Sequence, residues 1–329
     1  MDQVTITNNI AAAQQTIGLL RREVGRVVIG QQAIVDRLVV ALLIRGHVLV
    51  EGLPGLAKTL LVKTLAGAID ATFKRVQFTP DLLPADITGT LIFNPGDRTF
   101  TPRLGPIFAN FVLADEINRA PAKVQSALLE AMQERQVTIG ETSYRLPDPF
   151  VVIATQNPIE HEGTYALPEA QIDRFVMKLK VGYPTPDEEL RMLGLYLDPT
   201  APRIEVSRVL ALTDVASIAH LVASVHVDEK IGRYIVQIVN ATRHPADFRL
   251  GALTAHVAYG ASPRATLALA HVAKGHAFID GRAFVVPEDV KAVAHDVLRH
   301  RLVLSYEAAA EQIDADRVVD QVLTAVPVP

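Results

Sequence analysis

The sequence predicts an α/β protein: an αβα sandwich around a parallel sheet, followed by a smaller, all-helical domain. Three apolar runs carry the first half of this prediction, at residues 48–50, 111–114 and 150–155. They lack polar alternation, as is typical of strands buried on both faces of a parallel sheet. From residue 183 onward, apolar residues recur at three- and four-residue spacing, which predicts packed helices instead.

A glycine-containing loop follows the first apolar run and leads into a predicted helix at residues 60–68. A strand, a loop and a helix N-terminus in this order direct backbone N–H groups and the positive end of the helix dipole at one small volume. The sequence therefore predicts a polyphosphate site. Its loop residues are Gly52, Leu53, Pro54, Gly55, Leu56, Ala57, Lys58 and Thr59.

Two side chains of this loop have expected roles. Lys58 is expected to reach the terminal phosphates as a catalytic point charge, and the Thr59 hydroxyl to ligate Mg²⁺. Ala57 replaces the glycine that usually precedes the lysine. Its methyl group is tolerable only where the backbone is already helical. A chance turn containing Gly, Lys and Thr is the alternative, and the strand, loop and helix order disfavours it.

Two acids follow the second apolar run. Asp115 and Glu116 fall at the carboxyl end of this predicted strand, where parallel sheets bind ligands. We expect Asp115 to order the water shell of a magnesium ion, and Glu116 to act as general base for an attacking water. A solvated helix cap would explain an isolated acid pair, but not one behind a fully apolar strand.

The third apolar run ends in Thr155, Gln156 and Asn157. Since three strand ends would converge at this edge, we expect the Asn157 amide to contact the terminal phosphate and the attacking water. A simple Asn-Pro turn is the alternative.

An arginine lies beyond this site. Arg174 lies near the end of a short helical pattern at residues 168–175, which precedes a further predicted strand at 176–179. At a domain edge it could complete the site of a neighbouring subunit, because an arginine supplied in trans raises phosphoryl-transfer rates by ~10³ or more. The alternative is a surface arginine paired with Asp173 or Glu169, which would contribute little.

Taken in order, these motifs resemble the AAA+ ATPases, and more narrowly the MoxR family. The resemblance runs from about residue 27 to the end of the chain and is strongest between 28 and 180. The segments that carry it are residues 28–31 (VIGQ), 51–59 (EGLPGLAKT), 78–89 (FTPDLLPADITG), 115–121 (DEINRAP), 154–158 (ATQNP) and 262–265 (SPRA).

The resemblance implies roles for matched residues. Gly30 and Gln31 would lie beside the adenine of ATP, Asn157 would be sensor 1, and Arg174 the arginine finger. Arg264, which follows Ser262 and Pro263 at a helix start, would be sensor 2 in the helical lid. Ala57 becomes a signature of the family.

Two further patterns predict β-hairpins. One spans residues 89–101 with a turn at 94–97, and the other spans 136–146 with a turn at Gly140. Between them a helix is predicted at 121–134. By resemblance the hairpins correspond to the helix-2 insert and the pre-sensor-1 hairpin, which line a central pore. Surface hairpins without mechanical consequence are the alternative.

Composition and length agree with two domains, which we expect at residues 1–182 and 183–329. The 329 residues are 49% hydrophobic and include no cysteine. Disulfides, thiolate catalysis and zinc-thiolate sites are therefore excluded. The N-terminus lacks a signal-like pattern, and no apolar run approaches ~20 residues. We expect a cytoplasmic protein without membrane insertion.

The second domain is expected to contain helices at residues 188–197, 213–225, 228–244, 263–277 and 287–300. Neither domain is basic, and without Trp the chain offers few stacking platforms, so nucleic acid is not the favoured partner. Eight of the ten histidines lie in this domain without i, i+4 pairing. Structural histidines are therefore favoured over a metal site.

The predicted function is Mg²⁺-dependent ATP hydrolysis by a homo-oligomer, expected to be a hexamer, that remodels or matures a protein client. By resemblance, the maturation includes metal or cofactor insertion, and the partner carries a von Willebrand A domain. Two alternatives stay open: an ATP-gated scaffold or timer that does no mechanical work, and the motor subunit of a metal chelatase.

Overall fold

The chain forms two compact units. The computed structural model describes residues 3–158, 164–197 and 204–329. One unit, here called the sheet unit, comprises Thr16–Leu167 and Leu179–Ala216. The other, the lid unit, comprises Met1–Gln15, Pro168–Lys178 and Ser217–Pro329.

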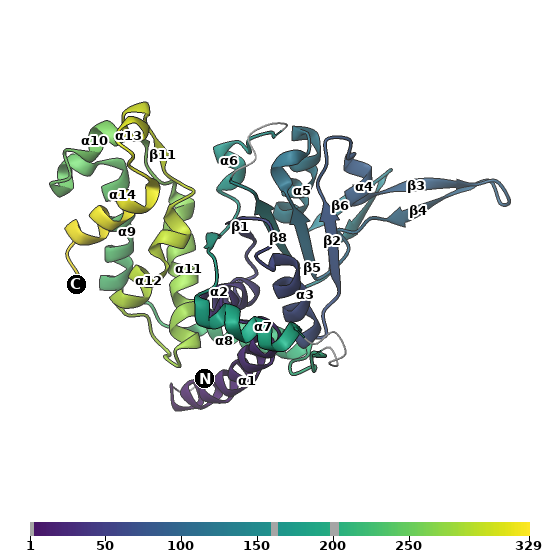
Figure 1. The fold of residues 1–329 in the computed structure, drawn as a ribbon, viewed down its shortest axis with the longest axis horizontal. Coiled ribbons are helices and arrows are strands. Elements are labelled where there is room, and N and C mark those ends of the chain that lie inside the picture. The colour runs from purple at the N-terminus through teal and green to yellow at the C-terminus, as the bar shows by residue number, and fades with distance from the viewer. Residues whose placement is uncertain (1–2, 159–163, 198–203) are drawn as a thin grey trace. The chain divides into compact units, whose positions relative to one another are not determined.

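A five-stranded sheet organises the sheet unit. Its order is β2-β5-β8-β1-β9, and the pairs β2–β5, β5–β8 and β8–β1 are parallel (Figure 1). All three apolar runs are strands of this sheet, as predicted. The strand bounds are β1 Val48–Gly52, β2 Phe73–Gln77, β5 Phe111–Asp115, β8 Val151–Gln156 and β9 Met177–Val181.

Helices flank the sheet and connect its strands. Helix α3 begins at Lys58, directly after the glycine-containing loop, and packs on β2 and β5. Helix α1 begins in the lid unit and ends in the sheet unit. The other helices of the sheet unit are short or amphipathic. The bounds are α1 Gln3–Val27, α2 Gln32–Leu43, α3 Lys58–Ala68, α4 Pro84–Thr88, η1 Ile117–Arg119, α5 Ala122–Glu134 and α7 Pro186–Tyr196.

Both predicted hairpins are present. Strands β3 (Gly89–Asn94) and β4 (Thr99–Leu104) pair antiparallel and form an arm that extends beyond the sheet (Figure 1). Strands β6 (Gln136–Ile139) and β7 (Thr142–Arg145) form the second hairpin. A Cβ atom at Gly140 would lie 2.7 Å from Leu91, so the second hairpin packs directly against the first.

The lid unit is helical apart from one short two-stranded sheet formed by β10 and β11. Helices α9, α11, α12 and α14 pack on one another around a core of Val, Ile, Leu and Ala side chains. The bounds are α6 Glu169–Ile172, α8 Leu212–Ser224, α9 Glu229–Arg243, η2 Pro245–Phe248, α10 Leu253–His256, β10 Val257–Tyr259, α11 Pro263–Ile279, α12 Pro287–Leu298, β11 Val303–Leu304, α13 Tyr306–Ala310 and α14 Ala315–Ala325.

The compact units do not follow the boundary expected at residues 182 and 183. The sheet unit continues past residue 182 to Ala216. Residues 204–211 pack on it, because the Val209 and Leu210 amides donate to the Ala68 carbonyl, and the Ser207 amide donates to the Glu23 carboxylate at 2.7 Å. Conversely, the segment Pro168–Lys178 packs with the lid unit. A functional boundary at 182 therefore remains a prediction that packing alone does not test.

Among the described residues, no helix combines the length and the apolar character that crossing a membrane requires.

A buried histidine connects β8 with α5 just before β1 begins. His47, just before β1, accepts a hydrogen bond from the Val152 amide through Nδ1 at 3.0 Å and contacts the Met132 carbonyl through Nε2 at 3.2 Å. Since Nδ1 accepts, Nε2 must carry the proton. The ring also packs edge-on against Phe150. Burial lowers the pKa of His47 to about 4, from 6.5. The ring is therefore neutral at pH 7.

This histidine predicts acid sensitivity. Between pH 6.5 and 4 the unfolded chain protonates His47 while the folded chain does not, so stability is lost as the pH falls below 6.5. At pH 5 the loss from this residue is about 2 kcal/mol. Chemical denaturation at pH 8 and at pH 5 measures the free energy of unfolding at each pH. The difference between the two values should be smaller for His47→Gln than for the wild type. Equal dependence in both proteins would contradict the assignment.

Candidate functional site

One pocket of about 420 Å³ collects most of the predicted site residues. It is lined by residues 54–60 of the loop and α3, and by Arg75, Asp115, Glu116 and Asn157. Lys58, Thr59, Asp115, Glu116 and Asn157, expected from separate strand ends, therefore lie around one volume. The pocket is large enough for a polyphosphate.

The loop geometry explains how the phosphate cradle forms. Gly55 has φ +86°, a conformation that favours glycine. Ala57 has φ +54° and ψ 22°, so the backbone that carries its methyl group is helical but left-handed. That conformation costs an L-residue roughly 1–2 kcal/mol. The strain is local to the site and places Lys58 at the first position of α3.

The Lys58 ammonium folds back over its own loop. Its Nζ donates to the carbonyls of Gly52 at 2.5 Å and Leu53 at 3.2 Å. Burial lowers the pKa of Lys58, and the charges of Asp115 and Glu116 oppose this shift. Phosphate oxygens would compete with the two carbonyls for the ammonium.

Asp115 is held by groups from two neighbouring strands. Its Oδ1 accepts from the Thr155 hydroxyl at 2.6 Å, and its Oδ2 accepts from Arg75 at 2.6 and 2.9 Å. The carboxylate is thus fixed by short hydrogen bonds from two strands. Oδ2 accepts both of the Arg75 bonds, whereas Oδ1 keeps a further lone pair, so a water molecule of a magnesium shell fits at Oδ1.

Glu116 has one occupied and one available oxygen. Its Oε2 accepts from Gln77 at 2.7 Å and from Arg119 at 3.1 Å. Within the described part of the chain, no hydrogen bond to Oε1 is found. The backbone at Glu116 is left-handed, with φ +56°, and its amide donates to the Thr155 hydroxyl at 2.8 Å. A general base needs such a free oxygen on a fixed side chain.

Sequence analysis missed Arg75 and Gln77 as site residues. Both lie on β2, which pairs with β5, and their side chains are two positions apart, hence on one face. Arg75 also donates a hydrogen bond to Gln77 at 2.7 Å, so the residue that contacts Asp115 is linked to the residue that contacts Glu116. The available signal was this pair of polar residues at the end of a predicted strand beside the acids.

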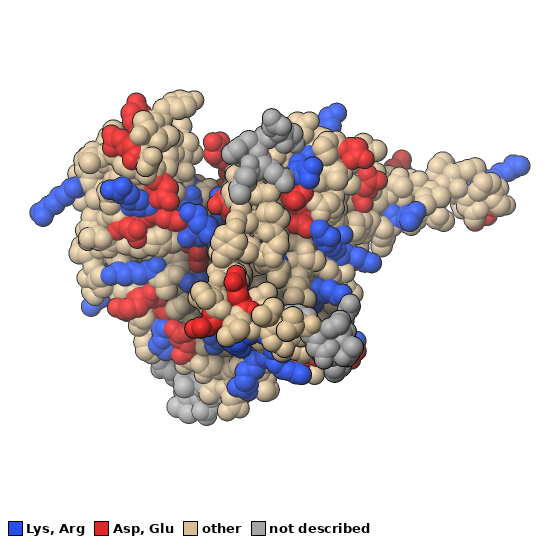
Figure 2. Space-filling view, in the orientation of Figure 1, with Lys and Arg blue, Asp and Glu red and all other residues tan. Residues whose placement is uncertain are grey.

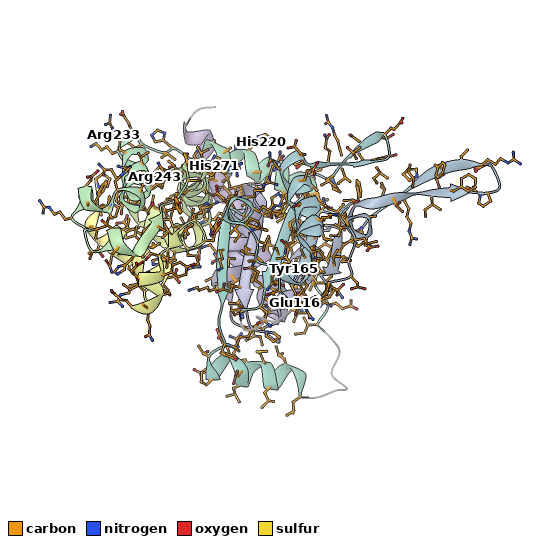
Figure 3. The ribbon with its side chains drawn as sticks, turned by 90° about the horizontal axis from the view of Figure 1, so that it is seen from above. Glu116, Tyr165, His220, Arg233, Arg243 and His271 are labelled. Carbon is orange, nitrogen blue, oxygen red and sulfur yellow. The ribbon has the colours of Figure 1, made fainter. Side chains whose placement is uncertain are left out.

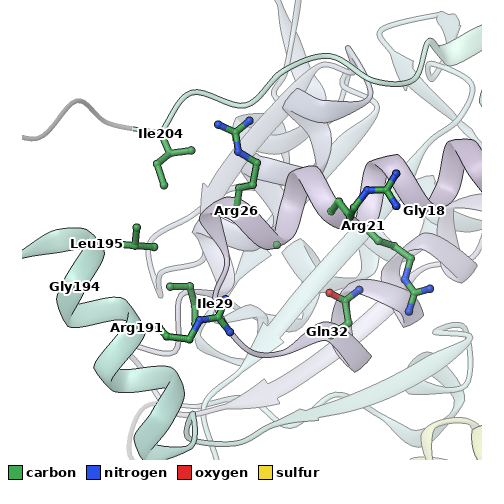
Figure 4. A pocket seen from close by; sticks show the side chains of 11 residues that line it. Gly18, Arg21, Arg26, Ile29, Gln32, Arg191, Gly194, Leu195 and Ile204 are labelled. Atoms are coloured by element: carbon green, nitrogen blue, oxygen red, sulfur yellow. The ribbon is translucent and has the colours of Figure 1, made fainter.

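Gly30 and Gln31 lie at a second place in the sheet unit. Both have positive φ, and a Cβ at Gly30 would meet the Glu188 side chain of α7 at 2.8 Å. Next to them, a pocket of about 810 Å³ lies between α1 and α7 (Figure 4). Its lining combines apolar Ile29, Leu195 and Ile204 with Arg21, Arg22, Arg26 and Arg191.

The two remaining predicted residues, Arg174 and Arg264, belong to the lid unit. Arg264 lies at the start of α11, where the Ser262 hydroxyl caps the helix by accepting from the Arg264 amide at 3.1 Å. The Arg264 guanidinium is half-exposed and lies 3.9 Å from the Asp173 carboxylate. Glu116, by contrast, lies in the sheet unit, among the labelled side chains of Figure 3.

One histidine and two acids of the lid unit lie close enough to share an ion. Ligand atoms of His276, Asp280 and Asp289 are within 4.8 Å of one another. Arg282, however, donates to both carboxylates. The cluster is therefore an ion-pair network. Burial raises the pKa of Asp289, but hydrogen bonds from His276 and Arg282 outweigh this effect and lower the pKa to about 2.

Acidic and basic side chains are interspersed on the face shown in Figure 2.

Comparisons with known proteins agree with this geometry. Residues 47–177 match the family described as "ATPase family associated with various cellular activities (AAA)", and residues 252–322 match an AAA lid domain. The chain is 49% identical to Chaperone MoxR1 of Mycobacterium tuberculosis, over 97% of this chain and 84% of the relative. It is 34% identical to Protein MoxR of Paracoccus denitrificans, over 92% and 93%.

A solved structure is similar as well. A candidate ATPase from Cytophaga hutchinsonii superposes with a TM-score of 0.92 at 46% identity, covering 98% of this chain and 97% of the other.

Two substitutions should separate binding from turnover. Lys58→Ala removes the charge that meets the phosphates, so we expect ATP binding to be lost. Glu116→Gln removes only the base, so binding should persist while turnover falls at least ~100-fold. Equilibrium titration with a fluorescent ATP analogue and steady-state phosphate release measure the two effects. Wild-type turnover in Glu116→Gln would remove Glu116 from the mechanism.

Proposed function

The chain belongs to the MoxR family of AAA+ ATPases, and from this premise we propose that it binds Mg²⁺ and ATP at the strand-end pocket and hydrolyses the terminal phosphoanhydride. One observation carries the proposal: Lys58, Thr59, Asp115, Glu116 and Asn157 line the same pocket of about 420 Å³. The transfer of a phosphoryl group to water needs a phosphate-binding loop, a pair of acids and a polar group that orients the water, and these residues supply all three.

In this proposal each residue has one task. The loop amides and the N-terminus of α3 bind the phosphates, and Lys58 supplies charge to the terminal ones. Thr59 and Asp115 would hold Mg²⁺, which offsets the charge that develops on phosphate oxygens. Glu116 Oε1 accepts a proton from the attacking water, while Gln77 and Arg119 hold the other oxygen. Asn157 orients that water.

The adenine would bind beside Gly30 and Gln31. Gln31 donates weakly to the Gly182 carbonyl at 3.5 Å, which brings residues 30–31 next to the start of α7. The neighbouring pocket offers Ile29 and Leu195 as apolar contacts for a purine. The missing Cβ at Gly30 lets the Glu188 side chain of α7 approach this backbone closely, which keeps α7 beside residues 30–31.

We propose further that the active unit is a ring, most simply a homo-hexamer. The sheet unit supplies loop, metal ligands, base and Asn157, whereas Arg174 and Arg264 belong to the lid unit. Arg174 would act in trans, on the ATP of a neighbouring subunit, and Arg264 in cis as the lid's sensor.

The work done by this ATPase is proposed to be remodelling of a protein client. A relative of the chain is named a chaperone. The β3–β4 arm exposes apolar side chains, including Phe93 and Phe100, whose rings contact each other at 5.2 Å between centroids. An exposed apolar surface of this kind favours an ATPase that contacts a polypeptide client over an ATP-gated timer that does no mechanical work. A partner with a von Willebrand A domain, and metal or cofactor insertion, rest on the family resemblance alone.

A mixing experiment tests the ring. Arg174→Ala and Glu116→Gln should each bind ATP and hydrolyse it at least ~100-fold more slowly than the wild type. Mixing the two should restore part of the activity, because some interfaces then combine a wild-type Arg174 with a wild-type Glu116. Specific activity should also rise with protein concentration as rings assemble. A mixture no more active than the average of its parts would refute trans action.

A second variant tests the arm. Phe100→Ser should leave basal turnover within about twofold, because the arm contributes no residue to the strand-end pocket. It should lower the stimulation of turnover by a permanently unfolded protein, such as reduced and carboxymethylated lactalbumin. The matched control is Thr101→Ser on the same strand. Equal stimulation of both variants would argue against client contact through the arm.

A further inference from the structure

One buried guanidinium holds the segment that carries Arg174. The Arg301 side chain is 2% exposed and lies just after α12. Its Nη2 donates to the carbonyls of Asp173 at 3.2 Å and Phe175 at 2.7 Å, which are the carbonyls on either side of Arg174 in sequence. Its Nη1 donates to the Val176 carbonyl at 3.2 Å.

Asp173 supplies the countercharge. Its Oδ1 accepts from Arg301 Nε at 2.7 Å, and its side chain is only 16% exposed. A guanidinium taken out of water is tolerated only when a carboxylate and several acceptors replace its hydration. Removing the charge of Asp173 would leave Arg301 buried without its partner, so the pair is one unit and its two halves depend on each other.

The same carboxylate reaches the start of α11. Asp173 Oδ2 accepts from the Ser262 hydroxyl at 2.8 Å, and Ser262 in turn caps α11. Arg264 is the outermost group, at 3.9 Å and half-exposed. The shorter distances and the deeper burial show that Asp173 fixes Arg301 and Ser262. It holds Arg264 only loosely.

We propose that Asp173 is a positioning residue for ATP hydrolysis: paired with Arg301, it fixes the backbone around Arg174 to the lid unit, so that each subunit's lid carries the arginine it presents to a neighbour. The inference rests on the function proposed above. According to this inference, contacts within the lid unit, and not contacts with the sheet, determine the position of Arg174. Misplacing a catalytic group by about 1 Å costs up to ~100-fold in rate.

The test compares two carboxylates that pair with neighbouring arginines. Asp173→Asn removes the charge facing Arg301. Asp316→Asn is the matched control, because Asp316 pairs with Arg299 at 2.8 Å and is 24% exposed. We expect Asp173→Asn to lower kcat 10- to 100-fold with unchanged ATP affinity, and Asp316→Asn to change kcat less than twofold. Thermal unfolding of each variant shows whether it is folded at the assay temperature, so that a loss of kcat can be separated from a loss of folded protein.

Arg301→Lys is a second variant in case Asp173→Asn folds poorly. Lysine keeps the charge but cannot donate to the Asp173 carboxylate and to the carbonyls of residues 173, 175 and 176 at once. The same loss of kcat is expected.

Mixed rings show which arginine Asp173 serves. Asp173→Asn should regain activity when mixed with Glu116→Gln, which supplies an intact Arg174, but not when mixed with Arg174→Ala. The reverse pattern, or equal kcat in Asp173→Asn and Asp316→Asn beside an active wild type, would overturn the inference alone. A wild type without ATP turnover would instead overturn the proposed function, and this inference with it.

Discussion

The candidate site depends on the register between β5 and β8. Ala114 pairs with Ala154, which places Asp115 beside Thr155 at the end of two parallel strands. The Thr155 hydroxyl then donates to the Asp115 carboxylate and accepts from the Glu116 amide. A shift by one residue would turn every side chain of the strand to the opposite face. Both strands are buried on both faces, so burial alone does not set the register. Polar contacts at the two ends of the pair hold it: the Asn110 side-chain amide donates to the Pro149 carbonyl at 2.9 Å, and the Thr155 hydroxyl donates to Asp115 at 2.6 Å.

Strained backbone recurs at this edge. Ala57 and Glu116 both adopt left-handed conformations, which are uncommon for residues with a Cβ. Ala57 lies directly before α3, at the end of the loop that follows β1, and Glu116 lies between the end of β5 and η1. The surrounding strands and helix hold these residues in place, because the energetic cost must be met by packing elsewhere. Strain of this kind turns Lys58 and Glu116 toward a shared pocket, which relaxed strand or helix geometry would not do.

Sequence patterns predicted the parts of the fold that local chemistry determines. Apolar runs predicted β1, β5 and β8, and turn residues predicted both hairpins, because each signal lies within a few neighbouring positions. The predicted site residues at the strand ends followed from the rule that parallel strands end together. Arg75 and Gln77 did not follow, since their roles depend on which strand pairs with β5. The packing of Pro168–Lys178 with the lid unit depends on Arg301, more than 120 residues away. No local pattern reports a contact of that range.

The proposed site residues are divided between the two units, which has a consequence for the control of ATP turnover. The groups proposed to hold the phosphates, Lys58 and the loop amides, belong to the same unit as the proposed base, Glu116. The arginines proposed to meet charge in the transition state, Arg174 and Arg264, belong to the other. Charge that contacts only the transition state raises kcat, whereas charge that contacts both states only tightens binding. In the proposed mechanism, ATP binding therefore uses groups of the sheet unit, whereas turnover also uses the two arginines of the lid unit. Any factor that displaces these arginines should lower kcat more than it lowers the affinity for ATP.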